Sequence, residues 1–145
     1  MTSCIFCINP TTQSFDEISD DRFIKEYRHW WLYLQREDKL RTTKQAAGLL
    51  IAKTHTREVA EVSDEAKVEL LSIIKEAAKL LCKKAGTTYT SQESVGFNQG
   101  DKAGQTVMHA HVHILPVSRE DPDELKYRSG IGGAFEALRR ERLHS

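Results

Sequence analysis

The most regular pattern of apolar positions lies between residues 63 and 85. Apolar side chains recur there every three or four residues, which is the period of an α-helix with one buried face. Ser63 is placed to cap the first turn, and the pattern stops at Gly86, after Lys83 and Lys84. The pattern predicts one long helix, with an apolar stripe made of Leu70, Ile73, Ile74, Ala77, Leu80 and Leu81.

Shorter apolar runs elsewhere predict β-strands. Residues 46–55 form a nearly continuous apolar run that ends at a polar corner, and Thr and Tyr residues favour a strand over 87–95. A strand over 107–117 follows from alternating apolar and polar positions. The aromatic-rich residues 23–35 predict two strands or one bent strand, and residues 134–143 predict a short basic helix.

Trp30 and Trp31 are adjacent in the aromatic segment. Successive side chains of a strand point to opposite faces of its sheet, so the two rings cannot both face one core. One of them is expected over a loop or at a dimer interface, where the surplus aromatic residues would fit well.

Length and charge narrow the classes of function. The chain has 145 residues, enough for a single domain spanning residues 1–145 with its own core. Its formal net charge is zero and it has no basic block, which argues against nucleic acid or a membrane surface as a partner. We recognise no signal peptide or membrane span, and the three cysteines favour a reducing, cytoplasmic setting.

The candidate chemistry centres on His109, His111 and His113. They alternate with aliphatic residues, so a strand would carry all three imidazoles on one face and its aliphatic side chains on the other. Histidine is suited to catalysis, metal binding and proton transfer near neutral pH. The alternatives are a metal-chelating tract and a half-buried strand that is rich in histidine.

Cys4 and Cys7 form a Cys-x-x-Cys pair near the start of the chain. The pair could be a redox dithiol or half of a zinc site, and by itself it decides neither. Cys82, near the end of the predicted helix, is expected to be a packing residue.

These motifs resemble those of the histidine triad (HIT) family. The family signature is His-x-His-x-His, preceded by a lead-in that residues 98–107 resemble, and residues 46–55 resemble a further family segment. Two positions depart from that segment: Ala47 replaces a histidine found in many members, and Ala52 replaces a proline. The resemblance implies an α+β, HIT-like fold, with an antiparallel sheet of about five strands, one long helix packed on it and a short C-terminal helix.

The resemblance also implies roles for individual residues. His111 would be the nucleophile, with His113 and Gln105 as further catalytic residues. The implied nucleotide and phosphate contacts are Asn98, Gly104, Gln105, Thr106, Val107 and His113. Asn98 and the glycines could instead be plain turn residues. A structural Zn²⁺ would be bound by Cys4, Cys7, His55 and His109, unless His55 is a surface residue and the cysteines are thiols without metal.

The implied function is hydrolysis of nucleotides at the α-phosphate through a nucleotidyl-histidine intermediate. Dinucleoside polyphosphates and nucleoside phosphoramidates are the implied substrates, with adenine or another purine as the base, and the implied assembly is a homodimer. The polar residues 36–45 would line the rim of the nucleotide pocket. Two alternatives are a nucleotidyltransferase and a nucleotide-binding or protein-interaction module with little activity, which the replacement at Ala47 keeps open.

Overall fold

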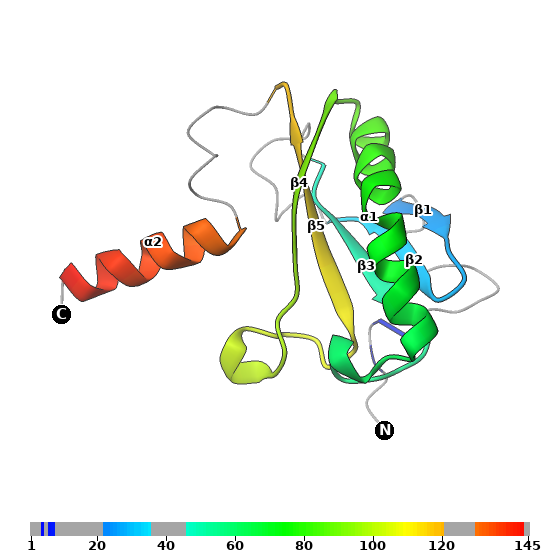
Figure 1. Ribbon diagram of the computed structural model, residues 1–145, viewed down its shortest axis with the longest axis horizontal. Helices are drawn as coiled ribbons and strands as arrows, with labels where there is room; N and C mark the ends of the chain where they lie inside the picture. Colours follow the sequence, from blue (N-terminus) through cyan, green and yellow to red (C-terminus); the bar gives the residue numbers. More distant parts are fainter. Residues whose placement is uncertain (1–3, 5, 8–21, 36–45, 121–129, 144–145) are drawn as a thin grey trace.

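The fold was examined in a computed structural model that describes residues 4, 6–7, 22–35, 46–120 and 130–143. Five strands, two α-helices and two short 3₁₀ helices occupy these residues (Figure 1). The strands are β1 (Phe23–Glu26), β2 (Trp30–Leu34), β3 (Gly48–Ala52), β4 (Tyr89–Gly96) and β5 (His111–Ser118). The helices are η3 (Val59–Glu61), α1 (Asp64–Ala85), η4 (Asp101–Ala103) and α2 (Gly130–Leu143).

The five strands form one antiparallel sheet in the order β1-β2-β3-β5-β4. The histidine-bearing strand β5 therefore lies inside the sheet, between β3 and β4. In its register with β3, Leu49 pairs with His113 and Ile51 pairs with His111. This confirms the predicted α+β architecture and fixes His111 and His113 on a strand that is hydrogen-bonded on both sides, whereas His109 lies just before that strand.

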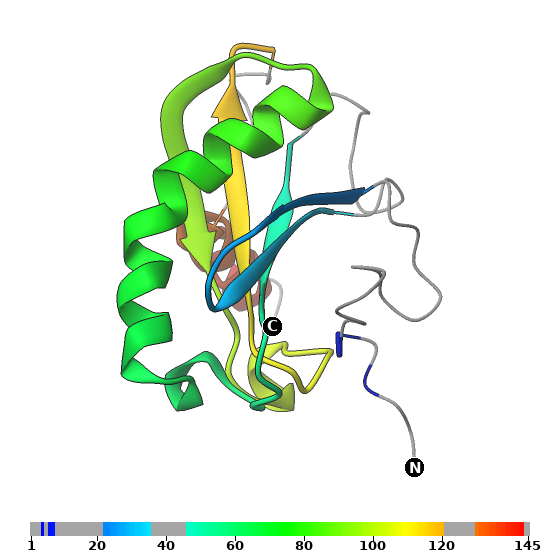
Figure 2. The same cartoon turned by 90° about the vertical axis from the view of Figure 1, so that its right-hand side faces the viewer.

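Helix α1 begins and ends where the sequence predicts. The Ser63 hydroxyl accepts a hydrogen bond from the Ala66 N–H at 3.2 Å, and Gly86 adopts the left-handed conformation that closes the helix, with φ of 75°. Figure 2 shows α1 lying across one face of the sheet. Its apolar stripe packs there on Ala110, Val112 and Ile114, the aliphatic residues that alternate with the histidines. The predicted apolar residues of α1 and the aliphatic residues between the histidines thus pack together in one core.

Two contacts fix α1 to the hairpin of β1 and β2. Both carboxylate oxygens of Glu69 accept hydrogen bonds from the turn, one from Arg28 N–H at 3.1 Å and one from His29 N–H at 2.7 Å. The buried Trp30 ring donates from Nε1 to the Ala66 carbonyl at 2.9 Å. These hydrogen bonds hold the hairpin of β1 and β2 against α1.

The opposite face of the sheet carries a smaller apolar cluster, which we call the Phe6 cluster. Its buried members are Phe6, Trp31, Tyr33, Leu49 and Ile51. Trp30 and Trp31 do point to opposite faces, and both are buried within this one chain, at 0% and 6% exposure. Helix α1 covers Trp30, and Trp31 packs against Phe6 of the N-terminal segment. The use of the aromatic segment in a dimer interface stays a prediction.

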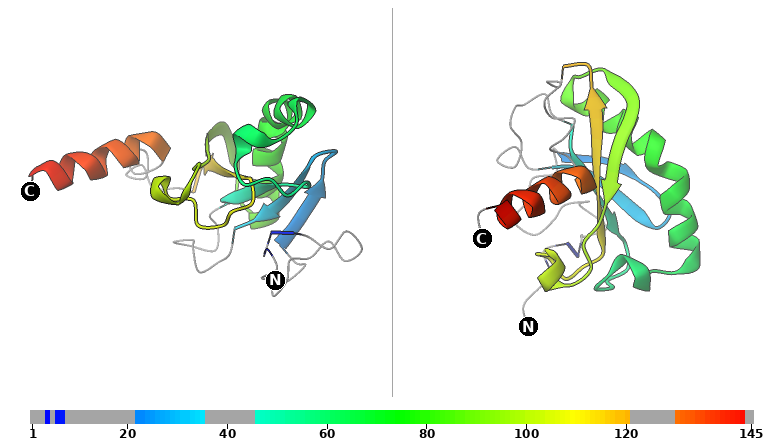
Figure 3. Two further views of the ribbon diagram at one scale, coloured as in Figure 1. Left: turned by 90° about the horizontal axis from the view of Figure 1, so that it is seen from below. Right: turned by 60° about the vertical axis from the view of Figure 1, so that its left-hand side comes forward.

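Some element boundaries differ from the predictions. Strand β5 starts at His111 instead of residue 107, because the residues before it follow the 52–56 segment: Ala52 N–H donates to the Ala110 carbonyl and Ala110 N–H to the Thr56 carbonyl. Helix α2 begins at Gly130, four residues earlier than predicted, and Figure 3 shows it beside the sheet and away from α1. The predicted loop over 36–45 lies outside the described residues. Within those residues, no helix is both long and apolar enough to cross a membrane.

Candidate active site and metal centre

The imidazole of His111 is held by a backbone carbonyl two residues earlier in the chain. Its Nδ1 lies 2.7 Å from the His109 carbonyl oxygen, and because a carbonyl can only accept, Nδ1 carries the proton. This leaves Nε2 with its lone pair. Burial lowers the pKa of the imidazole, although the bond to His109 opposes the shift. His111 is therefore neutral near pH 7, with one nitrogen able to act as a nucleophile.

His113 lies next to His111 on the same face of β5. The ring centroids are 5.3 Å apart and the planes are 75° from parallel. Burial lowers the pKa of His113, and the charge that His111 would carry lowers it further. The two rings form a pair of neutral imidazoles on the sheet face opposite α1.

The loop from residue 98 to residue 107 leads into this pair and is shaped by glycine. Gly100 and Gly104 have φ of 97° and 101°, in the region that residues with a side chain rarely adopt. Asn98 lies against Gly104, because a Cβ added at Gly104 would come within 3.2 Å of the Asn98 Nδ2. The predicted phosphate-contact residues Gly104 and Thr106 are exposed, whereas Val107 is half-buried.

Gln105 holds this loop together from the inside. Its side chain is buried, and Oε1 accepts from the Gly100 N–H at 2.9 Å. Its Nε2 donates to two backbone carbonyls, that of Arg57 at 2.6 Å and that of Val107 at 2.8 Å. Both amide hydrogens are thus used within the protein, so in this conformation the side chain shapes the loop and does not donate outward.

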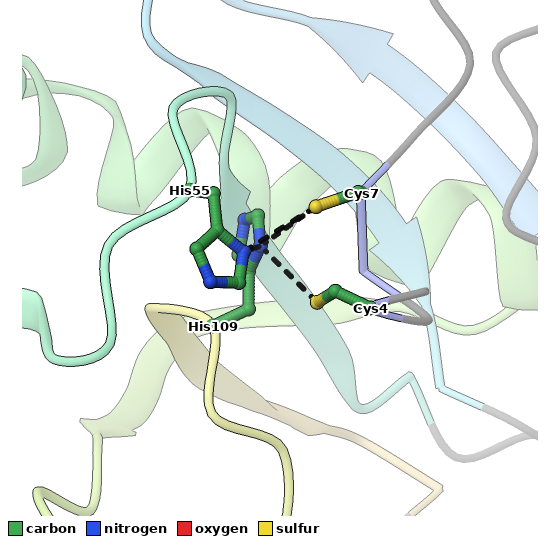
Figure 4. Close-up of side chains that lie close together, drawn as sticks. All are labelled: Cys4, Cys7, His55 and His109. Atoms are coloured by element: carbon green, nitrogen blue, oxygen red, sulfur yellow. Dashed lines mark hydrogen bonds between the residues drawn. The ribbon is translucent and has the colours of Figure 1, made fainter. Parts of the chain in front are cut away.

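His109 lies just before β5, and its ring faces the N-terminal cysteines. Its Nε2 lies 2.7 Å from the Ala52 carbonyl, so this nitrogen carries the proton and Nδ1 keeps its lone pair. Nδ1 lies 3.0 Å from His55 Nδ1 and 3.5 Å from Cys4 Sγ. Cys7 Sγ completes the group at 3.3 Å from His55 Nδ1 (Figure 4).

The donors of this group fit a metal ion. The four ligand atoms of Cys4, Cys7, His55 and His109 all lie within 4.8 Å of one another. Two imidazole nitrogens that approach to 3.0 Å repel one another unless a proton or a cation lies between them. The Ala52 carbonyl also fixes the tautomer of His109, a common arrangement at histidine ligands. This group, from three separate parts of the chain, could hold a metal ion.

Phe6 is a member of the site that the sequence reasoning missed. Its ring packs edge to face against His111, with centroids 4.9 Å apart and planes at 85°. The only sequence signal was its position between Cys4 and Cys7, which carries no information about the partner of its ring. The contact depends on the N-terminal segment lying against the far face of the sheet.

Two other sequence features fall outside the site or at its margin. Ala47 directly precedes β3, and its carbonyl accepts a hydrogen bond from Gln35 N–H at 2.8 Å. Cys82 lies on the buried face of α1 and packs in the core, as predicted.

Comparison with known proteins finds a family profile and relatives that match this chain. A profile of the HIT domain matches residues 39–120. Over 138 residues the chain is 32% identical to an uncharacterized 16.1 kDa HIT-like protein of Mycoplasma pneumoniae, covering 92% of this chain and 78% of that protein. Over 90 residues it is 30% identical to the adenosine 5'-monophosphoramidase hnt1 of Schizosaccharomyces pombe, covering 62% of this chain and 59% of that enzyme.

A solved structure supports the fold. The HIT family hydrolase from Clostridium thermocellum superposes with a TM-score of 0.57 at 23% identity, covering 85% of this chain and 97% of that one. At this identity the likeness concerns the fold. The chain spans 54% and 59% of the lengths of two of its curated relatives.

Proposed function

The chain belongs to the HIT domain family, and on that premise we propose that it is a nucleotide hydrolase that uses His111 as its nucleophile. The observation that carries the proposal is the hydrogen bond from His111 Nδ1 to the His109 carbonyl. It leaves the other ring nitrogen unprotonated beside a glycine-shaped loop. A neutral nucleophile suits a phosphate centre, because it is not repelled by the anionic oxygens.

The proposed reaction has two steps at the α-phosphorus of a nucleotide. His111 Nε2 attacks the phosphorus, the bond to the leaving group breaks, and a nucleotidyl-His111 intermediate forms. Water then attacks the same phosphorus, the N–P bond breaks and the mononucleotide leaves. Dividing one difficult displacement in this way is the usual benefit of covalent catalysis.

The surrounding residues would bind and orient the phosphate. The N–H groups of Gly104 and Gln105 donate to the carbonyls of Asp101 and Gly100, so within residues 104–107 those of Thr106 and Val107 would donate to the phosphate oxygens as charge builds, with Asn98 nearby. Gln105 would contribute by holding the loop in shape, since its amide is bonded to backbone groups. His113 would contact the phosphate or the leaving group.

We propose that Zn²⁺ is the ion held by Cys4, Cys7, His55 and His109. Two thiolates and two imidazoles are a common ligand set for structural zinc, and such an ion would cross-link the N-terminal segment to the sheet. Thiolate ligands require reduced cysteines, which fits a cytoplasmic protein. A homodimer is also part of the proposal, and β4 at the edge of the sheet has one side free of any described strand.

The substrates we propose are nucleoside phosphoramidates and dinucleoside polyphosphates with a purine base. The relative named an adenosine 5'-monophosphoramidase supports the first class. A binding module with little activity is a second candidate, because Ala47 stands where many family members have a histidine.

Steady-state hydrolysis of adenosine 5'-phosphoramidate tests the proposal. We expect turnover by the wild type and a loss of roughly 10³-fold or more in His111→Asn. His29→Asn is the matched control, because His29 lies in the turn between β1 and β2, where its backbone is held by Glu69. Binding of AMP without turnover by folded wild-type protein would favour the binding module.

The glycine-shaped loop has a matched test of its own. Gly104→Ala and Gly86→Ala both place a side chain on a residue with positive φ, so both are strained. Only Gly104 lies in the proposed phosphate loop. We expect the KM for the nucleotide to rise in Gly104→Ala and to stay unchanged in Gly86→Ala, and equal KM values would contradict the proposed role of the loop.

A further inference from the structure

Phe6 links the metal site to the proposed nucleophile. It is 8% exposed and lies between two of the four candidate metal ligands, which are joined by a hydrogen bond from Cys7 N–H to the Cys4 carbonyl at 3.1 Å. Its ring makes the edge-to-face contact with His111 at 4.9 Å. It also lies 6.3 Å from His109, again edge to face at 81°. One aromatic ring therefore touches a ligand histidine and the nucleophile.

The hydrogen bond to His109 does not by itself fix the plane of the His111 ring. It fixes the position of Nδ1, but the ring can still tilt about that contact, and a tilt moves Nε2. A perpendicular aromatic ring against the imidazole removes this freedom, because the interiors of proteins are close-packed. Reaction requires His111 Nε2 to be in position for attack on phosphorus. A ring that prevents the imidazole from tilting should therefore raise the rate of that step.

The position of Phe6 depends in turn on the cysteines. Of the N-terminal 21 residues, the structure describes Cys4, Phe6 and Cys7, and this short segment packs on the Phe6 cluster. Hydrogen bonds between the Cys4 and Cys7 thiols and the rings of His55 and His109 connect this segment to the rest of the domain. A metal ion bound by these four residues would make that connection rigid.

We propose that Phe6 is a positioning residue for His111, and that the metal site holds Phe6 in place. The inference rests on the proposed function, since it assigns His111 as the nucleophile. It predicts that removing the Phe6 ring lowers the rate of reaction at His111 even when the metal stays bound. It also predicts that removing the metal acts on His111 partly through Phe6.

The first test compares Phe6→Ala with Phe6→Tyr, which keeps an aromatic ring. Tyr33→Ala is the matched control, because it removes a buried ring of the same cluster at a position that pairs with neither His111 nor His113. We expect kcat to fall roughly 10- to 100-fold in Phe6→Ala with KM little changed, since misplacement of a reacting group costs about this much. Phe6→Tyr should recover most of the loss. An equal fall of kcat in Tyr33→Ala, or a rise of KM alone in Phe6→Ala, would overturn the inference.

Two measurements keep this test independent of folding and activity. The thiolate-to-cobalt absorption of Co²⁺-loaded protein should be the same in wild type and Phe6→Ala, which shows that the ligand set is intact. The ring-proton signals of His111 in NMR should lose a ring-current shift in Phe6→Ala and keep it in Tyr33→Ala. If the wild type turns over no nucleotide, the proposed function fails, while these signals still decide whether Phe6 fixes the ring.

The second test removes the metal with a chelator from wild type and from Phe6→Ala. We expect the His111 ring signals to shift more in the wild type, because only there can Phe6 transmit the change. The difference between the two responses measures the part carried by Phe6, as in a double-mutant cycle. Equal shifts in both proteins would mean that the metal acts through His109 alone and would overturn the link to Phe6.

Discussion

The two faces of the sheet are built in different ways. The face under α1 is packed by aliphatic side chains that follow one another at regular spacing, and the helix that covers it is a single continuous segment. The opposite face is packed by a few aromatic residues and carries the histidines. Its cover comes from the N-terminal segment, held by Cys4 and Cys7. The first face owes its stability to burial, whereas the second depends on polar and ligand contacts between distant segments.

Truncation of a core residue on the buried face of α1 should show the largest effect on stability. Leu81 is such a residue and is completely buried. We expect Leu81→Ala to lower the free energy of unfolding by about 2–5 kcal/mol, measured by urea unfolding, because a cavity remains in a close-packed core. The kcat of the folded fraction should not change. A selective loss of kcat at unchanged stability would mean that the two faces are not independent.

Removal of the metal should have the next largest effect, and on the other face. Chelation should lower the free energy of unfolding by about 3–4 kcal/mol if the ion is present at a few hundred times its dissociation constant. It should also make the Cys4 and Cys7 thiols reactive toward a thiol reagent. Cys7→Ser should remove the response to the chelator. Thiols that react equally fast before and after chelation would rule out the metal site.

Gly48 tests how closely α1 packs against the sheet at β3. A Cβ at this position would lie 2.2 Å from Leu81 Cδ2 and 2.8 Å from the Tyr33 carbonyl oxygen. The carbonyl belongs to the backbone and cannot move aside, so we expect Gly48→Ala to cost about 1–3 kcal/mol of stability. Gly96→Ala is the control, since a Cβ there meets nothing within 4 Å. Equal unfolding midpoints for the two variants would contradict this packing.

The smallest effect we predict is on the pH dependence of stability. Burial and the neighbouring His111 lower the pKa of His113 in the folded protein. Below its ordinary pKa of about 6.5, the unfolded chain therefore binds more protons than the folded one, and stability falls as pH falls. Each such proton gives a slope of at most about 1.4 kcal/mol per pH unit. His113→Gln should flatten the slope between pH 5 and 7, and an unchanged slope would contradict the burial of this ring.

The sheet face that α1 covers was predicted well from the sequence, because the residues that determine it lie within single elements. The stripe from Leu70 to Leu81, the cap at Ser63 and the stop at Gly86 all lie within one segment, and each was found where expected. The alternation likewise predicted the two faces of β5 at His111 and His113, although the strand begins after His109. Periodicity predicts such features because a single element determines them.

The site face could be predicted only in part. The four candidate metal ligands were named from a family resemblance, and the structure brings them together. The contact between Phe6 and His111 joins positions far apart in the chain, and the bond from Gln105 to the Arg57 carbonyl joins residues 48 apart, so no local pattern encodes either of them. The burial of Trp31 also depends on other segments, because Phe6 and two residues of β3 pack against it.

The most direct test of covalent catalysis at His111 is intact-mass spectrometry of denatured protein after a brief, quenched reaction with adenosine 5'-phosphoramidate. The wild type should carry a transient adenylyl group that disappears as AMP is released, and His111→Asn should carry none. An adduct of the same mass on His111→Asn, or turnover by the wild type without any adduct at the shortest times, would contradict the account.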